Sequence, residues 1–493
     1  MLKLVLGTSG SGKTTLLYAR IRARAEAGKR SILLVPEQFT SSTEARIYRE
    51  LGDALSGMVE SYSFTSLAEH ILAALGGAAV QTLTDAGRAV LVRRALEELQ
   101  DNVHYYYRHR RSAAFCQMAA ETIDELKSAG LSGQQLQELA RDCGTESAKL
   151  GELALIFQGY ESLLAGTGMD PADRLELAAD RLEAALARDE LPDFLREREV
   201  FIDEFDTFNA PKKRLMGAML AALPAVTVAL CEDGAPMQPG DLELFSGAKQ
   251  VAAQLRQLAR KNGAQVAAPE LLRRDLRHKD APGLAALTEL LETGSCTPPE
   301  SAPELRLFAA ASREEEARCA AAAIRRLMRQ GVRCGKIAVV CRDISLYRAA
   351  VRYEFRMAEI PLYCDEPTTP EFSAPATAVR ALLALLRGAD MTEQLTVLAK
   401  TGLCDLTEPE VCALENYAYT WSPNAAAWRA EFTKSPRGFG DAELTEEDTQ
   451  NLTRAENARK KLVTAVDTLR GKVRSANAEQ ISRALYFCLK ELG

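Results

Sequence analysis

A glycine-rich run near the N-terminus limits the possible folds of this chain more than any other feature, because it matches G-x-x-x-x-G-K-[ST] at every fixed position. The run is Gly7-Thr8-Ser9-Gly10-Ser11-Gly12-Lys13-Thr14. The apolar residues 2–6 before it predict a buried strand, and residues 15–28, rich in Ala, Leu and Arg without Pro, predict a helix. Strand, glycine-rich loop and helix in this order are the context of a phosphate-binding loop. We therefore expect an α/β fold built around a nucleotide site.

Each residue type in the run suits phosphate binding. Glycines allow main-chain N–H groups to turn inward around an anion at a helix N-terminus, where the helix dipole favours negative charge. Lys13 is expected to reach the β- and γ-phosphates of ATP, and the Thr14 hydroxyl is expected to hold Mg²⁺. The expected nucleotide ligands are Gly7, Thr8, Ser9, Gly10, Ser11, Gly12, Lys13, Thr14 and Thr15.

An apolar strand that ends in two acids supplies the second half of the expected site. Residues 200–202 are apolar, and Asp203 and Glu204 follow them directly. Asp203 is expected to bind Mg²⁺ through water, and Glu204 to orient or deprotonate the attacking water. Such a strand end alone usually marks a strand that reaches solvent. Paired with a complete phosphate loop, it favours a catalytic set of Lys13, Asp203 and Glu204, with Thr14 and Asp203 at the metal.

Further strands and helices alternate along the first half of the chain. Strands are expected at residues 31–35, 59–62, 199–203 and 225–231, in addition to the first. Alternating strands and helices favour a parallel sheet, here a RecA-like nucleotide-binding domain formed by residues 1–75 and 192–280. Between these parts, residues 76–191 carry apolar side chains at helical spacing and predict a large helical insertion.

The second half of the chain predicts a second α/β unit. Pro and Gly cluster in residues 281–303, which we interpret as a linker. Residues 304–370 then predict the start of a second RecA-like domain, with strands at 305–309 and 336–341 and helices at 313–330 and 344–357. Residues 371–493 are again helical, and we expect a second helical insertion that the chain carries only in part.

Composition limits the environment and the partners. The formal net charge is −7, so nucleic-acid binding requires a local basic surface rather than a global field. The 11 cysteines are scattered without a C-x-x-C pair, which argues against zinc ribbons and disulfides and fits a reducing cytoplasm. The longest apolar run, residues 215–231, contains Pro224 and is expected to be a helix that leads into a core strand, not a membrane span.

A short segment, residues 105–111, combines three tyrosines with arginines and a histidine. One interpretation is a surface that follows a nucleic-acid backbone. We prefer the other, an amphipathic segment whose tyrosines face inward and whose arginines are solvated.

Several motifs together resemble one family. They are residues 7–14 (GTSGSGKT), 33–40 (LLVPEQFT), 61–68 (SYSFTSLA), 125–130 (ELKSAG), 169–175 (MDPADRL), 202–205 (IDEF) and 337–343 (IAVVCRD). In these residues the chain resembles the N-terminal part of the AddB (RexB) family, which forms one half of the bacterial ATP-dependent helicase/exonuclease AddAB, in the superfamily 1 helicase lineage.

The resemblance implies a partner and a substrate. It implies a heterodimer with an AddA-like helicase/nuclease subunit, ATP and Mg²⁺ as cofactors, and processing of DNA double-strand ends for recombinational repair. It also places two segments, residues 36–40 and 63–66, along a channel for single-stranded DNA. The implied DNA contacts are Gln38, Phe39, Thr40, Ser63, Phe64 and Ser66. The alternative for both phenylalanines is a place in the core at a strand end.

The resemblance has limits that leave three interpretations open. Family members carry a nuclease domain and an iron–sulfur cluster in their C-terminal part, and this chain shows neither signature, so we expect it to lack nuclease activity. The motor of AddB-family proteins is often weak. The chain is therefore either an active ATPase or a catalytically silent nucleotide-binding scaffold that recognises DNA. An unrelated P-loop ATPase or small-molecule kinase is the remaining alternative, although the helical insertion shows no arginine-rich lid.

Overall fold

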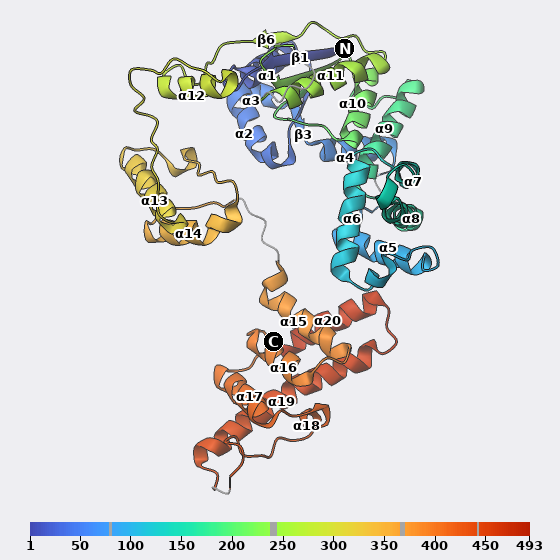
Figure 1. Cartoon of the computed structure of the whole chain (residues 1–493), viewed down its shortest axis with the longest axis vertical. Helices are drawn as coiled ribbons and strands as arrows, with labels where there is room; N and C mark the ends of the chain where they lie inside the picture. The colour runs from blue at the N-terminus through green and yellow to red at the C-terminus, as the bar shows by residue number, and fades with distance from the viewer. Residues whose placement is uncertain (78–80, 237–243, 365–369, 441–442) are drawn as a thin grey trace. The chain divides into compact units, whose positions relative to one another are not determined.

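The computed structural model describes residues 1–77, 81–236, 244–364, 370–440 and 443–493. The chain divides into two compact units, Met1–Leu307 and Phe308–Gly493. The first holds the sheet and the second is helical (Figure 1).

A six-stranded parallel sheet organises the first unit, in the order β3-β2-β4-β5-β1-β6. Its strands are β1 (Leu2–Gly7), β2 (Ser31–Leu34), β3 (Val59–Tyr62), β4 (Glu199–Ile202), β5 (Ala225–Cys231) and β6 (Glu270–Leu272). The first five confirm the predicted strands. The three-residue β6, next to β1, was not predicted because a run this short carries no periodic pattern.

The inner strands β2, β4, β5 and β1 are buried on both faces, as expected of a parallel sheet covered by helices, whereas the edge strands β3 and β6 are partly exposed. Side chains alternate between two core clusters: Leu4 and Leu6 of β1 belong to one, and Val5 belongs to the other. The same alternation separates Phe201 from Val200 and Ile202 on β4. This burial accounts for the apolar runs that marked the strands in the sequence.

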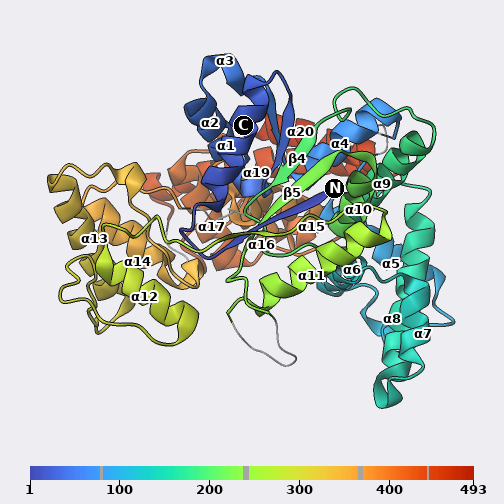
Figure 2. The ribbon, with the colours of Figure 1, turned by 90° about the horizontal axis from the view of Figure 1, so that it is seen from above.

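Helices form a layer on each face of the sheet (Figure 2). The Val5 face is covered by α1 (Lys13–Glu26), α2 (Thr40–Leu51) and α3 (Asp53–Ser56). The opposite face is covered by α4 (Phe64–Leu75), α9 (Pro171–Ala187), α10 (Ala210–Ala222) and α11 (Ser246–Lys261). Strand–helix alternation thus produces a three-layer α/β arrangement.

The predicted helical insertion has its own core. It contains α5 (Asp85–Glu98), α6 (Ala113–Ser128), α7 (Gly133–Ala140) and α8 (Ser147–Leu164). Residues such as Val92, Ile123 and Phe157 form a cluster separate from the sheet core. We expected the insertion to extend to residue 191, but α9 contributes Leu175 and Leu182 to the sheet core. The helical lobe with its own core therefore ends at α8.

The expected linker and the expected second sheet differ from the structure. Residues 281–303 contain a helix, α12 (Pro282–Thr293). Helices α13 (Arg313–Arg329) and α14 (Ile344–Met357) lie where predicted, but residues 305–309 and 336–341 are not strands. Leu307 and Val340 are 101% and 90% exposed. A strand needs backbone partners on a neighbouring strand, and the described part of this unit offers none.

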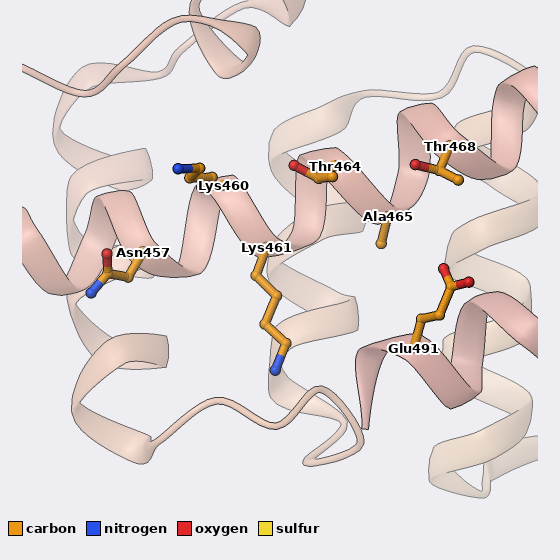
Figure 3. A pocket seen from close by; sticks show the side chains of 7 residues that line it. All are labelled: Asn457, Lys460, Lys461, Thr464, Ala465, Thr468 and Glu491. Atoms are coloured by element: carbon orange, nitrogen blue, oxygen red, sulfur yellow. The ribbon is translucent and has the colours of Figure 1, made fainter.

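The remaining helices of the second unit pack around a large apolar core that includes Trp428, which is fully buried. They are α15 (Ala374–Leu386), α16 (Met391–Lys400), α17 (Glu408–Trp421), α18 (Ala425–Arg429), α19 (Glu446–Val473) and α20 (Ala478–Leu492). An open hollow of about 400 Å³ runs along α19 beside Glu491 of α20 (Figure 3). The polar residues that line this hollow are exposed, apart from Lys461, which is partly exposed and paired with Asp405. No described helix is long and apolar enough to cross a membrane.

Candidate nucleotide-binding site

The glycine-rich loop connects the carboxyl end of β1 to the first residue of α1. Gly10 and Gly12 have φ of 78° and 90°, in the left-handed region that glycine adopts without strain. A Cβ at Gly10 would lie 2.7 Å from Oδ1 of Asp275 and 2.9 Å from Cβ of Arg277. Glycine at this position is therefore required both by the backbone and by the close approach of another segment.

The side chain of Lys13 is folded over the loop. Its Nζ donates hydrogen bonds to the main-chain carbonyls of Gly7 (2.7 Å) and Thr8 (2.8 Å). Burial, the largest cause, lowers the pKa of Lys13, while the nearby Cys231 and Asp203 act in the opposite direction. The ammonium group is thus held where the loop would surround an anion.

The hydroxyl of Ser11 supports a ligand at this loop. It is buried, and it has no hydrogen-bond partner within the described part of the chain. A buried hydroxyl without a partner is costly, and a bound anion would remove that cost. Thr15, one residue beyond the motif, is exposed at the start of α1.

The structure brings the two halves of the predicted site together. Asp203 follows β4, and its main-chain N–H donates to the carbonyl of Leu34 across 3.1 Å. The side chain of Thr14 lies beside the carboxylate of Asp203 and acts to lower its pKa. Burial, the largest cause, nevertheless raises the pKa of Asp203. A hydroxyl beside a carboxylate is a donor set that suits Mg²⁺, whose other ligands are usually waters and phosphate oxygens.

Glu204 has an unusual backbone conformation beside Asp203. Its φ is 65°, and its N–H donates to Oδ1 of Asp203 across 3.0 Å. Non-glycine residues in this region cost free energy and cluster at functional sites. Partial desolvation, and then the charge of Asp203, raises the pKa of Glu204. A carboxylate with a raised pKa is a better proton acceptor near neutral pH.

Arg46 of α2 was not identified from the sequence. Its guanidinium lies over the Tyr18 ring, 4.8 Å from the centroid. Its positive charge favours the ionised forms of Asp203 and Glu204, whose pKa values burial raises. No sequence motif marks this residue, because only the fold brings α2 next to the end of β4.

The segment after β6 also contacts the glycine-rich loop, which the sequence did not predict. Residues 273–279, which we call the strap, include Leu276, whose N–H donates to the carbonyl of Gly10 across 3.0 Å. Arg277 of the strap donates from Nη1 to the Ser9 hydroxyl across 3.3 Å. Beyond the strap, Glu292 of α12 approaches the loop: burial raises its pKa, and the nearby Thr8 side chain acts in the opposite direction. A run of basic residues was the only sequence signal for the strap.

The two predicted DNA-contact segments leave the sheet at the same edge. They follow β2 and β3, which are parallel neighbours, and the Val35 N–H donates to the Tyr62 carbonyl across 3.0 Å. Gln38 is exposed, and Phe39 is 37% exposed. The Thr40 hydroxyl donates to the carbonyl of Glu37 across 2.9 Å.

The second of these segments is used mainly for structure. Ser63 and Ser66 form a capping box at the start of α4, in which Ser66 N–H donates to Ser63 Oγ across 3.1 Å. Phe64 is only 2% exposed and packs edge-on against Phe205, with ring centroids 5.3 Å apart. The expectation that Phe64 stacks on a base is therefore corrected. Its ring belongs to the core, because the helix that Ser63 caps directs it onto the sheet.

The tyrosine-rich segment, residues 105–111, agrees in part with the interpretation that its tyrosines face inward and its arginines are solvated. Tyr106 and Tyr107 are half-buried and pack against the core of the insertion. Tyr105 is 49% exposed, and the guanidinium of Arg110 lies 3.9 Å from the centroid of the Tyr107 ring.

No metal cluster site is found in the described ranges: no three His, Cys, Asp or Glu side chains gather there in a way that could hold a metal ion. The cysteines of these ranges are unpaired thiols. The iron–sulfur cluster expected for full-length relatives therefore has no ligand set assigned here.

The fold and the site define a parallel α/β protein whose glycine-rich loop and acid pair share the carboxyl edge of one sheet. The chain belongs to the AddB family, because the family described as "ADDB, N-terminal" matches residues 4–288. This confirms the resemblance seen in the sequence motifs.

Curated relatives agree with this family. The chain is 32% identical over 444 residues, 87% of its own length and 37% of the relative's, to the B subunit of the ATP-dependent helicase/deoxyribonuclease of Desulforudis audaxviator. It is 31% identical over 522 residues, 100% of its own length and 44% of the relative's, to the protein of the same name from Moorella thermoacetica. The chain thus spans about two fifths of the length of these relatives.

Proposed function

We propose that this chain is the nucleotide-binding, DNA-engaging part of a helicase/exonuclease protein of the AddB family, which works with an AddA-like partner on DNA double-strand ends in recombinational repair. The observation that carries the nucleotide role is the meeting of the glycine-rich loop and the acid pair: Thr14 and the Lys13 ammonium group, both of the loop, lie close enough to Asp203 to act on its pKa. The family and the names of the relatives support the DNA role and the heterodimer. Cytoplasmic location is part of the same proposal, since DNA and a reducing environment are found there.

In this proposal, ATP binds with its phosphates in the loop. The main-chain N–H groups of Gly7 to Thr15 and the Lys13 ammonium hold the phosphate oxygens. The Thr14 hydroxyl and the Asp203 carboxylate would hold Mg²⁺, which when bound neutralises phosphate charge. Glu204 orients the attacking water and accepts its proton.

The domain organisation belongs to the same proposal. Residues 1–75 and 192–280 form a RecA-like domain together with α9, and the rest of residues 76–191 is the inserted lobe. Residues 281–303, which include α12, connect this domain to residues 304–370 and 371–493, a second domain and its helical insertion. The sheet order supports the first of these, because one strand, β5, separates the loop strand β1 from the acid strand β4. A ligand at the carboxyl edge then meets residues from both strands.

The test is calorimetric titration of the chain with ATP in the presence of Mg²⁺. Lys13→Ala should abolish measurable binding, because the loop loses the cation that contacts the phosphates. The matched control is Lys29→Ala, an exposed lysine after the helix that the loop begins. Equal affinity in wild type and Lys13→Ala would reject the nucleotide site.

The alternative is a scaffold that binds ATP without hydrolysing it. Measuring phosphate release from ATP distinguishes this scaffold from an active ATPase. The strained backbone and raised pKa of Glu204 favour hydrolysis. We expect DNA-stimulated phosphate release by wild type and a loss of about 10²-fold or more in Glu204→Gln, with ATP affinity retained. Wild-type protein that binds ATP and releases no phosphate would identify the scaffold instead.

A further inference from the structure

The strap crosses the glycine-rich loop at Gly10 and Gly12, at the positions that a Cβ of these residues would approach. Its Leu276 N–H donates to the Gly10 carbonyl across 3.0 Å, and a Cβ at Gly12 would lie 3.2 Å from the Leu276 side chain. β6 directs the strap to this place, because it pairs in parallel with β1, the strand that leads into the loop. The strap and the loop are thus built as one unit.

The conformation of the strap is fixed by Asp275. Its Oδ1 accepts hydrogen bonds from the N–H groups of Arg277 (2.9 Å) and His278 (3.1 Å), and its Oδ2 lies 2.8 Å from the His278 ring. A carboxylate that closes a turn on following N–H groups is a stable local arrangement. The turn holds the exposed Arg277 at the rim of the loop, where its guanidinium reaches the Ser9 hydroxyl across 3.3 Å.

Arg277 adds a second positive charge close to Lys13. Its guanidinium reaches the Ser9 hydroxyl, and Lys13 donates to the carbonyls of the preceding Gly7 and Thr8, so both cations lie at the same loop. Two like charges at one loop repel each other. An anion bound between them attracts both cations, and this attraction opposes the repulsion. The gain grows with the charge of the anion, so it is larger for a triphosphate than for a diphosphate.

We infer that Arg277 binds the terminal phosphate of a nucleoside triphosphate held in the loop, and is therefore a residue that favours ATP over ADP. The inference rests on the proposed nucleotide site and adds the residue that distinguishes its ligands. The chemistry suits the residue, because a guanidinium presents two parallel N–H donors to phosphate oxygens and is always charged. Its exposure leaves those donors accessible to a ligand.

A purely structural role predicts a different pattern. If Arg277 only fastened the strap to Ser9, its loss would loosen the whole loop. Binding of ATP and ADP would then fall together, since both use the main-chain N–H groups of the loop. A phosphate contact instead affects ATP selectively.

The experiment compares the affinities of the 493-residue chain for ATP–Mg²⁺ and ADP–Mg²⁺ in four variants. Arg277→Gln should weaken ATP binding by about tenfold or more and ADP binding by less than about twofold, as expected for loss of a charged hydrogen bond to one phosphate. Arg277→Lys should restore part of the ATP affinity, because it keeps the charge. Arg273→Gln, an exposed arginine of the same strap, should leave both affinities unchanged. Ser9→Ala removes the fastening hydrogen bond and should not reproduce the ATP-selective loss.

Three outcomes overturn the inference. They are equal losses for ATP and ADP in Arg277→Gln, no loss in either, and an ATP-selective loss in Ser9→Ala that matches Arg277→Gln. If the wild-type chain binds neither nucleotide, the proposed site fails and the inference fails with it. That result differs from the others, all of which require a wild-type chain that binds.

Discussion

Lys127 donates a hydrogen bond from Nζ to Oδ2 of Asp170 across 2.8 Å, and both side chains are buried. The bond joins α6 of the insertion to the residue that precedes α9, a helix of the sheet core. Asp170 also accepts from the Tyr160 hydroxyl across 2.6 Å, and Lys127 also pairs with Asp173. This network connects the helical lobe to the α/β core.

The first prediction follows from that network. Lys127→Met leaves Asp170 as a buried charge without its cation, and breaking a buried pair in this way costs about 3–5 kcal/mol of unfolding free energy. Denaturant unfolding monitored by circular dichroism measures the change. Lys149→Met is the control: Lys149 pairs with Glu146 at the surface, and we expect no resolvable effect. Equal destabilisation by the two variants would contradict the role of the network.

The second prediction concerns pH and Asp203. Metal binding needs the ionised carboxylate, and burial raises the pKa of Asp203 above its ordinary value. Mg²⁺-dependent ATP affinity should therefore be complete near neutral pH and fall as the pH drops through this raised pKa, beginning at a higher pH than an ordinary aspartate would give. Titrations with and without Mg²⁺ at a series of pH values measure it.

Asp203→Asn provides the comparison for that titration. The Asp203→Asn variant should lose the Mg²⁺-dependent part of ATP binding at every pH. The control Asp206→Asn, at an exposed position three residues later, should keep the wild-type dependence of ATP affinity on pH. A wild-type profile in Asp203→Asn would exclude this carboxylate from the metal site.

The third prediction separates Phe39 from Phe64. We propose that the exposed Phe39 contacts single-stranded DNA, so Phe39→Ala should weaken binding by about 1–3 kcal/mol with little change in melting temperature. Phe64→Ala removes a core ring and should cost about 3–5 kcal/mol of stability, with DNA affinity retained where the variant is folded. Fluorescence anisotropy and thermal unfolding of the same samples measure both quantities. Unchanged DNA affinity in Phe39→Ala would remove this residue from the channel.

The fourth prediction is that the chain alone does not degrade DNA. The reason is that the sequence carries no nuclease signature. Linear duplex incubated with the purified chain and Mg²⁺ should remain intact. Degradation that follows the protein through further purification steps would show a nuclease site that has not been recognised.

Local sequence was enough to predict the parts of the site that are continuous along the chain. The glycine spacing of residues 7–14, the apolar run before it and the helix after it are local chemistry, and the structure places β1, the loop and α1 accordingly. Buried strands such as β4 were also predictable, because burial on both faces requires an uninterrupted apolar run. The acid pair at the end of β4 was identified as a candidate for the same reason.

The meeting of distant segments at the loop, in contrast, depends on the tertiary fold. Arg277 and Ser9 are 268 positions apart, and their contact depends on the pairing of β6 with β1, which no short-range pattern encodes. The burial of Phe64 was equally undetermined, since an aromatic residue at a strand end fits either the core or a ligand. Residues 305–309 show the converse case: they have the composition of a strand but lack a partner strand in the described part of the unit. The spacing of apolar residues along the sequence indicates which side chains can be buried. Which neighbours bury them depends on long-range packing and backbone pairing.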